Sequence, residues 1–182
     1  AQLKKDGETL YIKIDYVKGK NLSEDYFEIR DNSFGMDEEV LRRAFNTGQK
    51  PQNTNGRSKY GLGMKTSSFW LGNKWSVTTT MLGETTEYMV TVDIKKIDRG
   101  NIKLKIEERE VKADEHYTNI KIWELHRRFV GRTLSKVRSY LSSIYRYDLL
   151  SEKVEIKWMN DYLTWRNLDE LLIEKFDGDL EK

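Results

Sequence analysis

The amino-acid sequence predicts an α+β fold, a two-layer sandwich in which helices cover one side of a mixed, mostly antiparallel sheet. Strand and helix patterns are mixed as far as Gly72, and strand patterns alone continue from there to Leu125. This order favours an antiparallel meander over the regular strand–helix alternation of a parallel sheet. The 182 residues are enough for one core of ordinary size with a small appendage.

The first three elements follow from the spacing of apolar side chains. An alternating run predicts a half-buried strand with Leu10, Ile12 and Ile14 on its inner side. A second strand is expected over Tyr26–Arg30. Asp37 can cap a helix whose core-facing positions are spaced for one side of the helix, Val40, Leu41, Ala44 and Phe45.

A long polar segment, Asn46–Tyr60, separates this helix from the next. It contains the single proline of the chain and almost no apolar side chains, and structureless loops of this length are often lids. A second helix is expected from about Leu62 to Leu71, ending at Gly72, a glycine typical of the position after a helix. Four strands are expected after it, over residues 74–80, 85–94, 101–108 and 117–125.

The character of the sequence changes after Leu125. Residues 126–138 contain no acidic side chain and five basic ones, Arg127, Arg128, Arg132, Lys136 and Arg138. A helix follows with Leu134, Val137, Leu141 and Ile144 on one face, and then a hairpin of residues 153–158 and 162–165. We therefore expect one domain at residues 1–125 and a second segment at 126–182, with the boundary near 126–131.

The composition excludes several classes of protein. With 32 basic and 30 acidic side chains, the net charge of +2 gives no overall signature of a polyanion-binding protein. The absence of cysteine excludes a disulfide framework and a cysteine-ligated metal. No stretch has the apolar length of a membrane span or a signal peptide. A cytoplasmic domain, or a nuclear one in a eukaryote, is therefore expected.

Two short motifs carry the chemistry. In Asp31–Met36, a carboxylate at a strand end can accept a hydrogen bond from the exocyclic amine of adenine, which guanine lacks at that position. Gly35 would allow close approach of the backbone to the base, and Met36 and Phe45 could pack against its ring. The alternative is an ordinary turn, since Asp, Asn and Ser all favour turns.

The second motif lies where the polar segment becomes a helix. Gly61 and Gly63 would leave backbone N–H groups exposed at a helix N-terminus, which is a site for anions such as phosphate. Lys65 adds a positive charge in the first turn, and Thr66 or Ser67 could add a hydroxyl donor. The motif is neither a Walker A loop nor a Rossmann fingerprint, and on its own a flexible turn is the alternative.

Together these motifs resemble the GHKL superfamily of ATPases (gyrase, the ninety-kilodalton heat-shock chaperones, histidine kinases and MutL), and within it most closely the MORC ATPases. Asp31–Met36 resembles the adenine motif Asp-x-Gly-x-Gly-Met, Ala44–Lys50 the entry to the ATP lid, and Tyr60–Gly72 the phosphate loop and its helix. His116–Trp123 resembles the later strand that bears a threonine beside the adenine carboxylate. The resemblance implies a Bergerat fold followed by the start of a transducer-like segment.

The resemblance also implies a role for individual residues. Asp31 would bind the adenine amine with support from Thr118, while residues 46–63 would form the lid and Lys65 would meet the phosphates. The expected nucleotide-binding residues are Asp31, Gly35, Met36, Phe45, Asn46, Gly48, Lys50, Gly61, Leu62, Gly63, Met64, Lys65, Thr66 and Thr118. Within a strand, however, Thr118 could equally be an ordinary β-branched residue.

Two departures from the family pattern affect this assignment. Ser33 stands where the family usually has glycine, which makes a positive φ less accessible there. The family's catalytic helix, with its general-base glutamate and magnesium-binding asparagine, precedes the strand that begins here near Glu8. Only Ala1–Gly7 come before that strand, so no catalytic residue or metal ligand is assigned. We expect both upstream of Ala1, with the sequence being a fragment of an ATPase.

The expected function is ATP binding and hydrolysis, with Mg²⁺, as a switch that closes a lid and drives homodimerisation. The protein would act on DNA or on a protein client. A nucleotide sensor without hydrolysis is one alternative, and a nucleic-acid-binding module that uses Arg127, Arg128, Arg132, Lys136 and Arg138 is another. A peptide-binding chaperone fragment stays open. A histidine kinase is disfavoured because His116 and His126 lie in or beside a strand.

Overall fold

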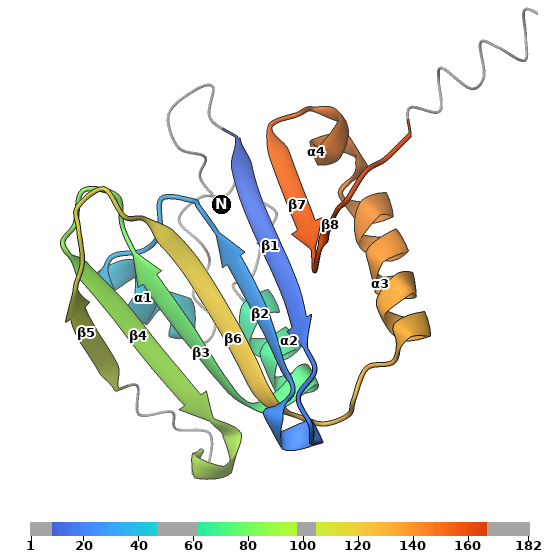
Figure 1. Cartoon of the computed structure of the whole chain (residues 1–182). Helices are drawn as coiled ribbons and strands as arrows, with labels where there is room; N and C mark the ends of the chain where they lie inside the picture. Colours follow the sequence, from blue (N-terminus) through green and yellow to red (C-terminus); the bar gives the residue numbers. More distant parts are fainter. Residues whose placement is uncertain (1–8, 47–61, 98–104, 167–182) are drawn as a thin grey trace, which may run out of the picture.

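The structure, a computed structural model, describes residues 9–46, 62–97 and 105–166. One eight-stranded sheet runs through this part of the chain in the order β5-β4-β3-β6-β2-β1-β7-β8 (Figure 1). All neighbouring strands are antiparallel except β1 and β7. The strands are β1 (Leu10–Val17), β2 (Tyr26–Asp31), β3 (Gly72–Thr80), β4 (Thr86–Asp93), β5 (Ile106–Glu110), β6 (Tyr117–Leu125), β7 (Val154–Trp158) and β8 (Asp161–Tyr162).

The helices give the second layer. They are α1 (Glu38–Phe45), α2 (Gly63–Leu71), α3 (Gly131–Ile144) and α4 (Arg146–Leu150), and Figure 1 shows α1 and α2 behind the sheet. Two short 3-10 helices, Leu22–Glu24 and Ile94–Lys96, complete the described elements. The predicted α+β sandwich with a mixed, mostly antiparallel sheet is therefore confirmed. None of the described helices is long and apolar enough to cross a membrane.

The core lies between the two layers. One row of paired buried residues crosses five adjacent strands on the helix-covered face, Tyr16, Phe27, Ile122, Trp75 and Val92. Phe45 from α1 stacks on Trp75 with ring centroids 5.2 Å apart, and Phe69 from α2 meets the same indole edge-on. These ring contacts fix both helices on the sheet.

Most predicted boundaries agree with the structure. Asp37 caps α1 as expected, because its Oδ1 accepts a hydrogen bond of 2.7 Å from the Val40 amide. Gly72 does end α2, but its φ of −158° is extended rather than left-handed. A Cβ there would lie 2.6 Å from the Trp123 carbonyl oxygen, so close approach of β6 explains this glycine. Val40 was expected on the core-facing side of its helix and is instead 38% exposed.

The residues after Leu125 continue the same sheet. α3 and α4 lead to β7, which pairs in parallel with β1, and Ile156 and Trp158 of β7 belong to the core cluster. β8 pairs with β7 around residues 159–160, so the predicted hairpin is present, but its second strand is Asp161–Tyr162 rather than 162–165. The division into domains at residues 126–131 stays a prediction.

Candidate functional site

The first residue of the first sequence motif, Asp31, belongs to a row of polar side chains on the helix-covered face. Asp31 of β2 pairs with Thr118 of β6, and Thr118 pairs with Thr79 of β3. Each residue lies four positions along its strand from the core row, so its side chain points to the same face. The hydroxyls of Thr79 and Thr118 form a hydrogen bond, with their oxygens 3.2 Å apart. A carboxylate and two hydroxyls therefore meet at the end of the apolar core.

Thr79 is the residue of this site that sequence reasoning missed. It is fully buried, its hydroxyl donates to the Tyr117 carbonyl at 2.9 Å, and the Met36 amide donates to it at 3.0 Å. It therefore ties the turn after β2 to the sheet beside Thr118. The available signal was the run of three threonines at residues 78–80 within a strand that also contains Trp75 and Val77.

Ser33 holds the Asp31 carboxylate. Its amide donates to Asp31 Oδ1 at 3.0 Å, and its hydroxyl donates to the same oxygen. The Ser33 carbonyl oxygen is in turn 2.8 Å from Nδ1 of His116. Ser33 is not among the described residues with positive φ, so serine is accommodated without strain at the position where the family usually has glycine.

Gly35 is required by the geometry of the same turn. Its φ is +73°, and a Cβ added there would lie 1.8 Å from the Thr80 carbonyl oxygen. No larger residue fits without moving β3 or the turn. Close approach of Gly35 to the sheet is thus established, whereas its predicted contact with a base stays a prediction.

The two apolar side chains expected beside a base lie differently. Met36 is half-buried and packs at the margin of the core cluster, next to the Asp31 row. Phe45 is 5% exposed and is stacked on Trp75, within the core. The expectation that Phe45 packs against an adenine ring therefore does not fit its position, because the apolar side of α1 must itself be buried.

The anion site expected at the N-terminus of α2 stays a prediction. Gly63 and Leu62 are exposed, the N-cap residue Leu62 makes no side-chain capping bond, and the first turn holds no acidic residue. The hydroxyls of Thr66 and Ser67 bond back to the carbonyls of Leu62 and Gly63, at 3.0 and 2.5 Å, so neither is directed outward as a donor. Met64 is half-buried and packs against the core.

Lys65 does not extend into solvent toward a phosphate position. It is 6% exposed, and its ammonium donates to the carbonyls of Ala44 at 2.9 Å and Asn46 at 3.0 Å. Burial lowers the pKa of this ammonium. Lys65 thus caps the C-terminal end of α1, where orphan carbonyls and the helix dipole favour a cation.

Part of the expected site cannot be placed. Gly48, Lys50 and Gly61, with most of the predicted lid, lie outside the described residues. Asn46 is the last described residue before them and forms the C-cap of α1. Within residues 9–46, 62–97 and 105–166, no group of three or more histidine, aspartate or glutamate side chains converges to hold a metal ion.

The basic segment after β6 is partly neutralised. Arg128 makes two hydrogen bonds to the buried Asp25 carboxylate, at 2.8 and 2.9 Å, and Arg138 pairs with Asp161 at 3.1 Å. The hydrogen bonds from Arg128 hold the pKa of Asp25 at about 2, below its ordinary value of 3.8. Burial alone would raise this pKa, and the hydrogen bond from Tyr16 also lowers it. Arg132 and Lys136 are exposed on α3.

Comparison with known proteins identifies the family. Residues 5–121 match the family described as histidine kinase-, DNA gyrase B- and HSP90-like ATPases. No curated protein matches the chain. Among solved structures, the ATPase region of Saccharomyces cerevisiae topoisomerase II bound to ICRF-187 (dexrazoxane) is similar, with a TM-score of 0.61 and 12% identity over 91% of this chain.

The ATPase and transducer domains of topoisomerase II from Balamuthia mandrillaris are also similar, with a TM-score of 0.57 and 11% identity over 91% of this chain. At such low identity the likeness establishes the fold. The chain spans less than half of either structure, 45% of the yeast protein and 44% of the Balamuthia protein.

Proposed function

Because the chain belongs to the family of histidine kinase-, DNA gyrase B- and HSP90-like ATPases, we propose that it binds ATP with the adenine at the Asp31 row. The observation that carries the proposal is the alignment of Asp31, Thr118 and Thr79 across three paired strands. A carboxylate in this position accepts a hydrogen bond from the adenine amine, and the neighbouring Thr118 hydroxyl can bind a ring nitrogen directly or through water.

The turn after β2 is built for this role. Ser33 fixes the carboxylate by two hydrogen bonds, so one Asp31 oxygen is oriented while the other is left for a ligand. Gly35 brings the turn against β3, and Met36 then lies beside the row. Adenine would enter a site whose acceptor is already oriented, which reduces the entropy lost on binding.

The phosphates would lie at the N-terminus of α2. No described side chain caps the N–H groups there, the first turn holds no acidic residue, and the helix dipole places its positive end at this terminus. Lys65 would act mainly through Asn46, at the start of the predicted lid, because its ammonium is bonded to that carbonyl. Phosphate binding at α2 and the position of the lid would then be linked through one side chain.

We expect this binding to work as a switch in a MORC-like ATPase that dimerises with ATP and acts on DNA or a protein client. Mg²⁺ would neutralise phosphate charge, but the described residues do not supply a converging ligand set, so no step is assigned to it. The general-base glutamate is expected in a preceding helix. A nucleotide sensor that does not hydrolyse ATP is the alternative, favoured if no such glutamate exists.

The test is the affinity for ATP of the wild-type chain and of the Asp31→Asn variant, by displacement of a fluorescent ATP analogue. Losing a charge-assisted hydrogen bond of about 1.5–3 kcal/mol should weaken ATP binding about tenfold to a hundredfold. Asp15→Asn is the matched control, because Asp15 lies on the opposite face of the sheet and pairs with Lys13.

Equal ATP affinity of the wild type and Asp31→Asn would place the adenine elsewhere. Thermal unfolding of each variant separates a lost ligand contact from a lost fold, since Asp31 also accepts bonds from Ser33. The same measurement on a chain extended at its N-terminus shows whether residues outside this sequence complete the site.

A further inference from the structure

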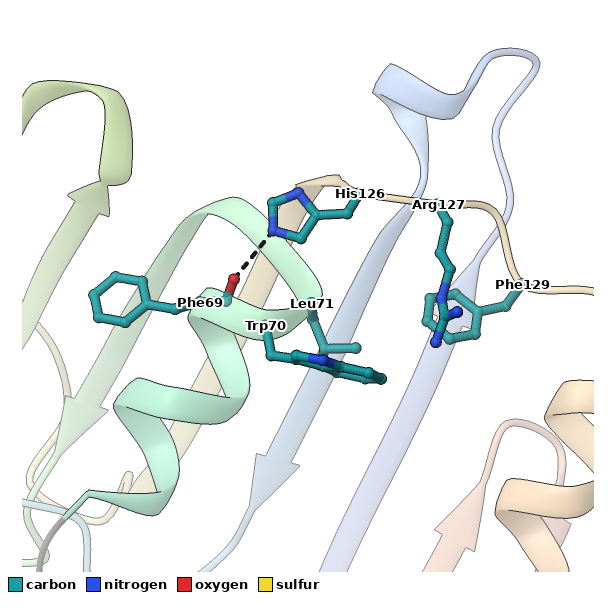
Figure 2. Close-up of a pocket in the computed structure, with 6 residues that line it drawn as sticks. All are labelled: Phe69, Trp70, Leu71, His126, Arg127 and Phe129. Carbon is teal, nitrogen blue, oxygen red and sulfur yellow. Dashed lines mark hydrogen bonds between the residues drawn. The ribbon is translucent and has the colours of Figure 1, made fainter.

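A second cavity lies at the other end of α2 from the nucleotide site. It measures about 410 Å³ and is lined by residues of the last turn of α2 and of the connection from β6 to α3, namely Phe69, Trp70, Leu71, His126, Arg127 and Phe129 (Figure 2). Trp70 is about 10 Å along the helix from Gly63, at a rise of 1.5 Å per residue. The cavity is therefore separate from the Asp31 row and from the N-terminus of α2.

The walls of this cavity are anchored by backbone contacts. The His126 amide donates to the Leu71 carbonyl at 3.0 Å, and the His126 ring nitrogen Nε2 lies 3.1 Å from the Phe69 carbonyl (Figure 2). Phe129 packs edge-on against Tyr16 and Phe27 of the core. The connection from β6 to α3 is thus held against α2 and the core on both sides of the cavity.

Two side chains of the cavity are unusual for a surface without a partner. Trp70 is 66% exposed although it is the largest apolar side chain of α2. The Arg127 guanidinium lies 5.3 Å from the Trp70 ring centre and 5.7 Å from that of Phe129, and no ion pair within the described residues joins it to a carboxylate. Tryptophan and arginine side by side in an apolar pocket are typical of interaction hot spots.

The charge around the cavity is positive and confined to a few side chains, which favours a short acidic segment as the partner. No acidic residue lines the cavity, and α3 begins beside it at Gly131 with no acid in its first turn. Arg128 and Arg138 are already paired with Asp25 and Asp161. Among the described residues of the segment 126–138, the cations left without an ion pair are Arg127, Arg132 and Lys136, which are too few for an extended track along a nucleic-acid backbone.

We infer that this cavity, hereafter the Trp70 pocket, binds an acidic peptide segment of a partner protein through one bulky apolar side chain. That side chain would insert between Trp70 and Phe129, and a neighbouring carboxylate would pair with Arg127. Among the described residues the guanidinium contacts these two rings and forms no ion pair, so it can turn away from the rings to a carboxylate without breaking an ion pair there.

The test uses a fluorescein-labelled peptide with one phenylalanine flanked on both sides by glutamates, measured by fluorescence anisotropy with the full chain. The wild type should bind it, with an affinity that falls as salt increases. Trp70→Ala and Arg127→Gln should each weaken binding about tenfold or more, as for truncated hot-spot residues. Arg127→Lys should have an affinity for the peptide between those of Arg127→Gln and the wild type, since lysine keeps the charge and loses the planar ring contacts.

Tyr140→Ala is the matched control, because Tyr140 is 67% exposed on α3, also among basic residues, and does not line the pocket. It should leave peptide binding unchanged. The inference is overturned if the peptide does not bind, if a peptide with serine in place of phenylalanine binds equally well, or if an oligothymidine binds through Trp70 and Arg127 and the peptide does not. None of these results bears on ATP binding at the Asp31 row.

Discussion

Replacing Gly35 with alanine is expected to lower the free energy of unfolding by about 3 kcal/mol. There are two causes: alanine is strained at a left-handed φ, and its Cβ overlaps with β3. The overlap dominates, because the new Cβ would lie 1.8 Å from the Thr80 carbonyl oxygen. Either β3, which carries Thr79 of the Asp31 row, or the turn after β2, which carries Ser33 on the Asp31 carboxylate, must move. ATP affinity should therefore fall together with stability, as measured by denaturant unfolding and nucleotide displacement.

Two other glycines separate the causes of this effect. Gly83 has a φ of +92° but no neighbour within 4 Å, so Gly83→Ala isolates the cost of the left-handed backbone, about 1–2 kcal/mol. Gly63 has neither a positive φ nor a close neighbour, and Gly63→Ala should be neutral or slightly stabilising. A Gly35→Ala variant no less stable than Gly83→Ala would contradict the close contact with Thr80.

Breaking the pair between Asp25 and Arg128 should have the second large effect on stability. Asp25 is fully buried, and it also accepts hydrogen bonds from Tyr16 and from the Gly19 amide. Arg128→Met leaves this carboxylate without its cation, which should cost about 3 kcal/mol, at the lower end for buried pairs because Arg128 is partly exposed. Thermal unfolding at neutral pH measures the loss.

The same pair predicts a pH dependence. The pKa of Asp25 is about 2 in the folded state and 3.8 ordinarily, so the carboxylate stabilises the fold above about pH 4. That stabilisation is lost as the pH falls from about 4 through 2. The wild type should therefore lose more stability over this range than Arg128→Met, in which the pKa of Asp25 is no longer held down by the guanidinium.

Arg138→Gln is the control for both measurements. It breaks the ion pair between Arg138 and Asp161, two side chains that are both largely exposed. The free energy of unfolding should change by less than about 1 kcal/mol. If Arg128→Met were as mild as Arg138→Gln, the Asp25 pair would not be a structural anchor. The segment after β6 would then have to be held by other contacts, such as those of Phe129.

The sequence was sufficient to predict the elements whose pattern is local. The alternation around Leu10 gave β1, the Asp37 cap gave the start of α1, and Gly72 gave the end of α2. The α+β sandwich and the family followed from the order of these elements and from the Asp31 and Gly61 motifs. Such signals depend on neighbours in sequence, which is why they can be interpreted without a structure.

What the sequence did not reveal depends on pairing between distant segments. Thr79 becomes a site residue only because β3 lies beside β6, and no local pattern distinguishes it from Thr78. Lys65 was expected at the phosphates because it lies in the first turn of α2. The C-terminal end of α1 lies close enough for its carbonyls to accept hydrogen bonds from the Lys65 ammonium instead. Likewise, the parallel pairing of β7 with β1 joins residues far apart in the chain.

The most direct test of the central claim is calorimetric titration of the wild-type chain with ATP and with GTP under the same conditions. Asp31 can accept a hydrogen bond from the amine of adenine, whereas guanine presents a carbonyl oxygen there and would be repelled. ATP should bind, and GTP should bind at least about tenfold more weakly, which corresponds to the loss of one such hydrogen bond. Equal binding of ATP and GTP would contradict adenine recognition by Asp31.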